Sequence, residues 1–263
     1  MSRSRLVFVL LALAAGLACR RTSDPDMQMT LQLNTEGLIR AESALADARD
    51  TLQKRLDQLD IGDAVVETVA GDRLSARLSK VAEPERVRRM IESPAVLELR
   101  LVRFTAGGEP SSREAVLSHY DGQLPPDLEI LREELRGEGG RVTGERFHAV
   151  EKRTVVTGGD FKTARPGRGR LNEPIVEFSV KPEASPAFAE ATGANIGSLL
   201  AIVLDGRVVA APKINARISE SGIIEGGFTE EGAEDLVIML RSGPLPGRLT
   251  IVEERIVEPG GGR

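Results

Sequence analysis

The stretch LLAIVLDGRVVAAP, residues 199–212, predicts a β-hairpin that organises the C-terminal half of the chain. Two apolar runs flank the dipeptide Asp205-Gly206, and such a dipeptide between strands is typical of a tight turn with positive φ at both central residues. Immediately upstream, residues 175–180 have the composition of a strand. Residues 185–193 follow as a helix with a proline in its first turn. The surroundings of the hairpin therefore mix strands with a helix.

Downstream of the hairpin, the strand pattern continues and then gives way to a helix. Residues 214–218 and 223–224 are typical of further strands. Thr229 can cap a helix that runs to about Gly243, because a threonine hydroxyl can accept from an amide of the first turn. Residues 248–257 form the last predicted strand. We expect this strand to complete the sheet of a separate N-terminal unit.

The N-terminal half predicts a small α+β layer in which helices cover one face of a sheet. Its elements, in order, are a strand at 29–33, a long helix capped by Asn34 or Thr35, a hairpin with strands at 65–69 and 73–79, a helix from Pro84 to about 92, and a strand at 97–102. Leucines recur every seven residues along the long helix. This repeat is compatible with a short coiled coil, but a helix that packs on a sheet is the simpler interpretation.

The pattern loosens over residues 105–150, where only residues 128–135 predict a helical turn. We interpret this stretch as a weakly ordered or divergent start of a second unit. The predicted division of the chain is a signal segment with a lipobox at 1–19, a tether at 20–28, a discontinuous first unit at 29–104 and 229–258, and a second unit inserted at 105–228.

The composition argues against several classes of protein. A formal net charge of -5 and an aromatic content of 3% disfavour binding to nucleic-acid phosphates or bases. Two histidines and one cysteine cannot build a tetrahedral Cys/His zinc site or an internal disulfide. The sequence has no Walker loop, no G-x-S-x-G elbow and no H-E-x-x-H motif. We therefore expect no enzyme activity, no cofactor, no metal and no nucleic-acid partner.

The single cysteine, Cys19, follows a segment typical of a secretory signal. Arg3 and Arg5 precede an apolar run at 6–18, which as a helix rises about 20 Å, short of the roughly 30 Å of a bilayer core. Two interpretations stay open: a lipoprotein site at which the Cys19 thiol is acylated, which we favour, and a simple cleaved signal with an incidental cysteine. Both place the remainder in the cell envelope, on the periplasmic side. No later segment has eighteen uninterrupted apolar residues, so no second anchor is expected.

Short motifs around the hairpin carry a family resemblance, and their shared order makes it specific. They are TGANIG at 192–197, LAIVLDG at 200–206, AP at 211–212, GGFT at 226–229, LRSGPLP at 240–246 and ER at 254–255, with upstream matches at 55–57, 97–102 and 156–158. In this combination the chain resembles the periplasmic region of the protein-export subunit SecD. Ser198 and Ala210 depart from the family pattern, which usually has a basic residue and a serine at those positions.

The resemblance implies an α+β fold with a ferredoxin-like base domain and an inserted α+β head subdomain. It also implies a function in Sec-dependent protein translocation, with unfolded exported polypeptides and Sec translocon components as partners. Proton-driven pumping needs carboxylates within membrane helices, so we expect binding or guiding of exported chains instead. The motif residues are then expected to be structural: Thr192, Asn195, Gly197, Asp205, Gly206, Pro212, Gly226 and Phe228.

Two alternatives stay open. The chain can be an envelope scaffold or binding lipoprotein that uses the same fold without a role in export, because a fold does not determine a function. It can also be one part of a split SecD whose membrane helices come from a separate chain.

Overall fold

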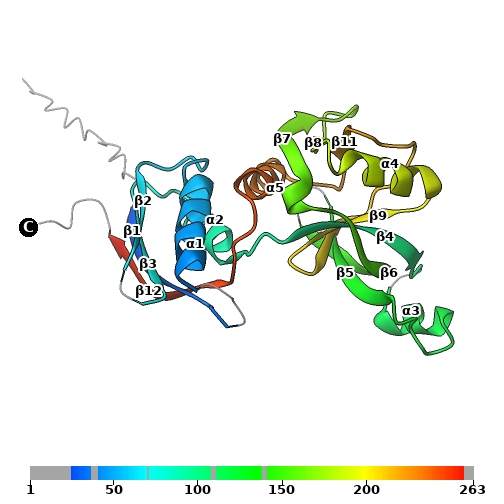
Figure 1. Cartoon of the computed structure of the whole chain (residues 1–263), viewed down its shortest axis with the longest axis horizontal. Helices are drawn as coiled ribbons and strands as arrows, with labels where there is room; N and C mark the ends of the chain where they lie inside the picture. Colours follow the sequence, from blue (N-terminus) through cyan, green and yellow to red (C-terminus); the bar gives the residue numbers. More distant parts are fainter. Residues whose placement is uncertain (1–24, 37–40, 70, 108–110, 138–140, 258–263) are drawn as a thin grey trace, which may run out of the picture.

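The computed structural model of the chain describes residues 25–36, 41–69, 71–107, 111–137 and 141–257. Figure 1 shows two lobes along the long axis of the molecule, which we call the base and the head, with helix α5 between them. The fold is α+β, with a ferredoxin-like base and an inserted head. Within the described ranges, no helix is long and apolar enough to cross a membrane.

The base is a four-stranded antiparallel sheet with two helices on the face that points toward the head (Figure 1). Its elements are β1 (Asp26–Leu33), α1 (Ala41–Leu56), β2 (Ala64–Thr68), β3 (Arg73–Leu78), α2 (Pro84–Glu92) and β12 (Leu249–Val257). The strand order β12-β1-β3-β2 is that of a ferredoxin-like sheet. Because β12 follows the whole head in sequence, the head interrupts the base between α2 and β12.

The core of the base forms where the apolar face of α1 packs on the sheet. Along β1, buried residues alternate with more exposed polar ones, so a single face carries Met27, Met29, Leu31 and Leu33. The stripe of α1 that packs on this face is buried throughout: Ala44, Leu45, Ala48, Leu52 and Leu56. The heptad pattern therefore marks a helix on a sheet and not a coiled coil. Leu38, the first leucine of the pattern, lies outside the described residues.

The head combines a closed five-stranded barrel with a three-stranded sheet. Its elements are β4 (Leu97–Thr105), α3 (Arg113–His119), β5 (Leu128–Arg136), β6 (Val142–Thr157), the short 3-10 turn Gly158–Asp160, β7 (Phe161–Arg168), β8 (Pro174–Val180), α4 (Ser185–Ala194), β9 (Leu200–Leu204), β10 (Arg207–Ala210), β11 (Ser221–Ile224) and α5 (Glu230–Ser242). The barrel order is β10-β5-β6-β4-β9, closed by the parallel pair Val208–Glu133. The second sheet has the order β11-β8-β7.

The predicted hairpin is confirmed as β9 and β10, which flank a turn with φ +50 at Asp205 and +77 at Gly206. Strand 97–105 also forms, but the expectation that it belongs to the base sheet is wrong. As β4 it pairs with β6 and β9 of the barrel. The fourth strand of the base sheet is β12, and the connection before residue 97 already leads into the head.

Three further expectations about the head are wrong. Residues 128–135 are not a helical turn but most of β5, because pairing with β6 along the strand overrides the local preference. Residues 105–150 are not weakly ordered where the structure describes them, since they include α3, β5 and much of β6. Residues 214–218 are a loop: Ile214 exchanges hydrogen bonds with Gly197 (2.8 Å) and Ser198 (2.8 Å), and no strand forms over these five residues.

Helix α5 joins the two lobes because it contributes to both cores. Leu236 and Leu240 pack in the head core, whereas Ile238 packs in the base core. Ion pairs between α2 and α5 add to this contact, among them Arg86–Asp235 at 2.8 Å. Burial raises the pKa of Asp235 in spite of the ion pair with Arg86.

The buried Arg55 of α1 holds both chain connections between the lobes. Its guanidinium donates to the carbonyl oxygens of Ser93 (2.5 Å) and Pro94 (3.2 Å) in the first connection and of Gly243 (3.0 Å) in the second. Burial lowers the pKa of Arg55 to about 10. Each connection also contains a left-handed residue, Ala95 (φ +57) and Gly243 (φ +82). Such a conformation in a non-glycine residue persists only when its surroundings fix it, and Arg55 is part of those surroundings.

Candidate functional site in the head

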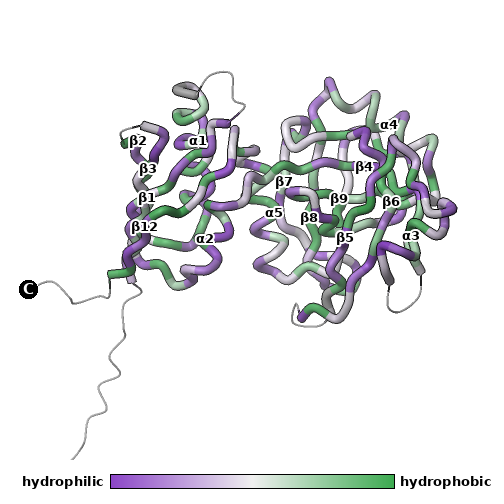
Figure 2. Tube along the Cα trace, turned by 90° about the horizontal axis from the view of Figure 1, so that it is seen from below, coloured by the Kyte–Doolittle hydropathy of each residue, from purple (hydrophilic) through white to green (hydrophobic). Residues whose placement is uncertain are grey.

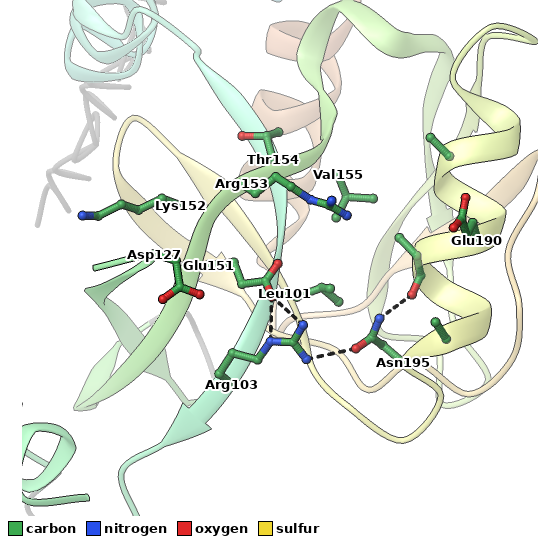
Figure 3. Close-up of a pocket in the computed structure, with 13 residues that line it drawn as sticks. Leu101, Arg103, Asp127, Glu151, Lys152, Arg153, Thr154, Val155, Glu190 and Asn195 are labelled. Atoms are coloured by element: carbon green, nitrogen blue, oxygen red, sulfur yellow. Dashed lines mark hydrogen bonds and ion pairs between the residues drawn. The ribbon is translucent and has the colours of Figure 1, made fainter. Parts of the chain in front are cut away.

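A groove of about 790 Å³ lies between helix α4 and strand β6 of the head (Figure 3). One wall is formed by α4 and the residue after it, including Glu190, Ala191 and Asn195. The other wall is formed by residues 151–155 of β6, and β4 contributes Leu101 and Arg103. The groove therefore combines charged side chains with the small apolar side chains of the helix.

The groove follows a part of β6 that is paired on one side only. β5 pairs with β6 as far as Glu151, opposite Leu128 at the start of β5. β4 pairs with β6 on the other side as far as Thr157. The Lys152 amide still donates to the carbonyl oxygen of Asp127 (2.8 Å), and beyond it no described strand lies on that side. Unpaired backbone groups at a sheet edge can pair with an added extended chain.

Arg103 links the three elements around the groove, as Figure 3 shows. Its guanidinium donates to the Glu151 carboxylate through Nε (2.7 Å) and Nη2 (2.5 Å), and to Asn195 Oδ1 through Nη1 (3.1 Å). Asn195 in turn donates from Nδ2 to the carbonyl oxygen of Ala191 (2.8 Å). This network fixes the C-terminal end of α4 against β4 and β6. The hydrogen bonds of Arg103 with Glu151 and Asn195 therefore set the width of the groove.

An aromatic cluster lies where the end of β4 meets α3. The Phe104 and His119 rings are stacked with centroids 3.7 Å apart, and the Tyr120 ring lies edge-on to both. Burial raises the pKa of Tyr120, and the groove residues Arg103 and Asp127 act on the same hydroxyl in opposite directions.

The motif residues of α4 and its C-terminal turn have distinct structural surroundings. Thr192 is buried, donates to the carbonyl oxygen of Phe188 (2.7 Å) and accepts from the Ile218 amide (2.9 Å). It thereby ties α4 to the loop before β11. Gly197 has φ +90, and its amide donates to the carbonyl oxygen of Ile214 (2.8 Å). Of this group, Asn195 is the one in the groove.

Asp205 lies far from the groove along β9, at the contact between head and base. Its carboxylate accepts from the Ser93 hydroxyl (2.5 Å) and the Val96 amide (2.9 Å). Its own amide donates to the carbonyl oxygen of Val96 (3.0 Å). The turn residue thus also binds the first connection between the lobes. Gly206 supplies the second positive φ of the turn.

Pro212, Gly226 and Phe228 lie together on another side of the barrel. The carbonyl oxygen of Pro212 accepts from the Leu200 amide (2.9 Å). A Cβ on Gly226 would lie 2.5 Å from the Cβ of Ala210 and 3.2 Å from the Phe228 ring, so glycine is needed for this close approach. Pro212 and Gly226 also line a second, smaller cleft of about 410 Å³.

Sequence reasoning missed Arg103 and Glu151, which shape the groove. Both lie in strands. Arg103 directly follows the family match at 97–102, and Glu151 directly follows the loosely patterned stretch 105–150, so neither residue belongs to a motif. Cys19, the predicted lipidation site, lies outside the described residues and stays a prediction. Within the described ranges, no group of three His, Cys, Asp or Glu side chains is placed to hold a metal ion.

Comparisons with known proteins agree on one family. The profile of "SecDF, P1 head subdomain" matches residues 131–247, and that of "Protein translocase subunit SecDF, P1 domain, N-terminal" matches residues 45–103. Protein translocase subunit SecD of Aquifex aeolicus is 37% identical over 222 residues, which are 84% of this chain and 41% of the relative. SecD of Koribacter versatilis is 32% identical over 241 residues, 90% of this chain and 43% of the relative. The chain thus spans about two fifths of these relatives.

Solved structures of SecDF share the fold. A crystal structure of SecDF in a super-membrane-facing form matches 90% of this chain and 32% of its own, with a TM-score of 0.65 and 26% identity. A structure of SecDF, described as a membrane component that enhances protein export, matches 87% of this chain and 99% of its own, with a TM-score of 0.61 and 28% identity. Because the profiles, the relatives and the structures cover base and head together, this chain belongs to the SecD family and corresponds to its periplasmic P1 region.

Proposed function

We propose that this chain assists Sec-dependent protein translocation on the periplasmic side of the membrane by binding extended segments of exported polypeptides. The proposal rests on membership of the SecD family together with one structural observation. The unpaired edge of β6 beyond Lys152 borders a groove that is open to solvent on the head. We propose binding without catalysis and without pumping by the chain itself.

The chemistry of the groove suits an unfolded chain of variable sequence. Hydrogen bonds to a strand edge involve only backbone groups, so they place little constraint on side chains. Four residues of β6, 153–156, span about 13 Å, enough for a short extended segment. The Ala191 and Ala194 side chains on α4 leave room opposite this edge, while the exposed Arg153 and Glu190 offer contacts of both charge signs.

The partners and the tether belong to the same proposal. The relatives are named as translocase subunits, so Sec translocon components are the proposed neighbours of the head. Acylation of Cys19 is the proposed attachment to the membrane, and mass spectrometry of the mature N-terminus tests it directly. A diacyl or triacyl mass on Cys19 supports the anchor, and an unmodified N-terminus after residue 18 contradicts it.

Site-specific photo-crosslinking in cells tests the binding site. A photoreactive residue replaces Arg153 or Glu190 on the two walls of the groove, and Arg73 on the exposed face of the base sheet serves as the matched control. We expect adducts with exported chains from both groove positions and few from position 73. Equal yields from all three positions, or adducts that contain neither exported chains nor translocon subunits, would overturn the proposal. The scaffold alternative predicts the latter result and unchanged secretion rates after deletion of the gene.

A further inference from the structure

The two edges of the base sheet differ in how their backbone groups are satisfied. At β2, the side chain of Gln53 acts as a neighbouring strand would. Its Nε2 donates to the carbonyl oxygen of Ala64 (2.9 Å), and its Oε1 accepts from the Val66 amide (2.8 Å). At β12, no described group forms a hydrogen bond with the outward backbone groups. β12 is therefore the open edge of the base, where another strand can add.

The phase of the β1–β12 ladder shows which backbone groups point outward. In an antiparallel pair, residues that bond to the neighbouring strand alternate with residues whose groups point away from it. The Asn34 amide donates to the carbonyl oxygen of Arg248 (2.8 Å), which sets the phase. Followed along the observed register, which includes one bulge, the alternation turns the amides and carbonyls of Glu254 and Ile256 outward.

The outward segment of β12, VEERI at 252–256, is complementary to itself in the antiparallel direction. If Glu254 meets Glu254 of a second copy, Glu253 faces Arg255 of that copy and Arg255 faces its Glu253. Val252 then faces Ile256, and these two side chains are 39% and 42% exposed in the single chain. Such opposite-charge and apolar pairs stabilise neighbouring strands. A shift of two residues, the smallest that keeps the outward backbone groups opposite each other, brings Glu253 to Glu253 or Arg255 to Arg255.

The central pair of Glu254 side chains is compatible with this register. Each Glu254 carboxylate already accepts two hydrogen bonds from Arg88 of its own chain, at 2.5 and 2.9 Å. The positive charge of Arg88 offsets the repulsion between the two carboxylates. Figure 1 shows that this end of β12 lies on the side of the base away from the head.

We propose that two copies of this chain associate through their β12 edges, antiparallel and centred on Glu254, so that the two base sheets form one continuous sheet. The contact goes beyond the proposed binding of exported chains and does not depend on it. Because five residues of each edge take part, the interface is smaller than that of a standard complex, and we expect a weak dimer with a Kd in the range of about 10–500 µM.

Charge reversal tests the register of the pairing. In the purified full-length chain, Glu253→Arg places two Arg–Arg contacts in the homodimer, and Arg255→Glu places two Glu–Glu contacts. We expect each variant alone to dimerise at least about tenfold more weakly than the unmodified chain in sedimentation analysis. An equimolar mixture of the two variants forms only Arg–Glu contacts, so we expect association to return to within about threefold. Glu67→Arg on β2 is the matched control and should have no effect.

A second variant tests the backbone pairing independently of charge. Ile256→Pro removes an outward amide that the β1 ladder does not use, a substitution that edge strands tolerate. Circular dichroism confirms that each variant is folded, and association should fall at least about tenfold. A monomer at about 500 µM for the unmodified chain would overturn the proposal. So would a dimer that neither the charge reversals nor the proline weakens, because another surface would then hold it.

Discussion

The base and the head close their sheets in different ways. In the base, two helices cover one face, and the Gln53 side chain binds the outward backbone groups of Ala64 and Val66 at the β2 edge. In the head, the barrel closes through the pair Val208–Glu133, and β6 stays unpaired on one side beyond Lys152, beside the groove. We infer that the head is the lobe that binds exported chains under the proposed function, and that the base positions the head. The contact between them, built around Arg55 and α5, determines where the groove points.

The largest expected effect comes from the core of the base. Leu52→Ala removes a fully buried side chain of α1 and should lower the free energy of unfolding by about 2–5 kcal/mol in urea titrations followed by circular dichroism. Leu171→Ala, at a residue that is 91% exposed in the head, is the control and should change it by less than about 0.5 kcal/mol. Since α5 belongs to both cores, we expect a single transition. A head transition that Leu52→Ala leaves in place would show that the lobes are independent.

Arg55→Met should have the next largest effect, because it leaves carbonyl oxygens in both connections without a donor. We expect a loss of about 2–4 kcal/mol and faster proteolytic cleavage at residues 93–96 and 243–247. Lys54→Met, at the exposed neighbouring position, is the matched control. Cleavage rates that stay equal in the two variants would mean that Arg55 does not hold the connections.

Asp205→Asn should have a smaller effect, about 1 kcal/mol, because the amide keeps the shape of the turn but loses a charged acceptor for Ser93 and Val96. Asp121→Asn, in a second Asp-Gly turn with φ +52, provides the control. Ser93→Ala in both backgrounds completes a double-mutant cycle. If the two changes are additive, the carboxylate and the hydroxyl are not coupled.

The smallest expected effect is on the acid sensitivity of the base. Hydrogen bonds from Arg88 hold the pKa of Glu254 below its usual range. A carboxylate with a lowered pKa in the folded state adds stability above the unfolded pKa and loses it as pH falls through the folded value. The unmodified chain should therefore lose more stability between about pH 5 and 3 than Glu254→Gln, by less than about 1 kcal/mol. Parallel pH profiles of the two proteins would contradict the assignment.

The sequence was sufficient to predict those elements whose structure depends on residues close to one another in the chain. Three such elements are the Asp-Gly turn, the leucine stripe of α1 and the cap at Thr229, whose side chain accepts from the Gly232 amide. The partner of a strand, in contrast, cannot be predicted from the neighbouring residues. Residues 97–105 and 128–136 became barrel strands because of pairings with β6, a strand in the segment that had no clear pattern.

The candidate site was harder to predict for the same reason. The groove depends on where β5 stops pairing with β6, and this is a property of register and not of composition. Asn195 was identified by its motif, but its partner Arg103 is distant in sequence. Asp205 was predicted as a turn residue, and its second role at the connection between the lobes became visible only in three dimensions.

Hydrogen exchange in the presence of an unfolded secretory precursor tests most directly whether the head binds at the β6 edge. Amide exchange is followed by mass spectrometry in the purified full-length chain, with and without the precursor. We predict slower exchange at residues 153–156 and in α4, and unchanged exchange in β2, where Gln53 already binds the outward groups of Ala64 and Val66. Slower exchange confined to the base, or no change in the head at saturating precursor, would contradict the account.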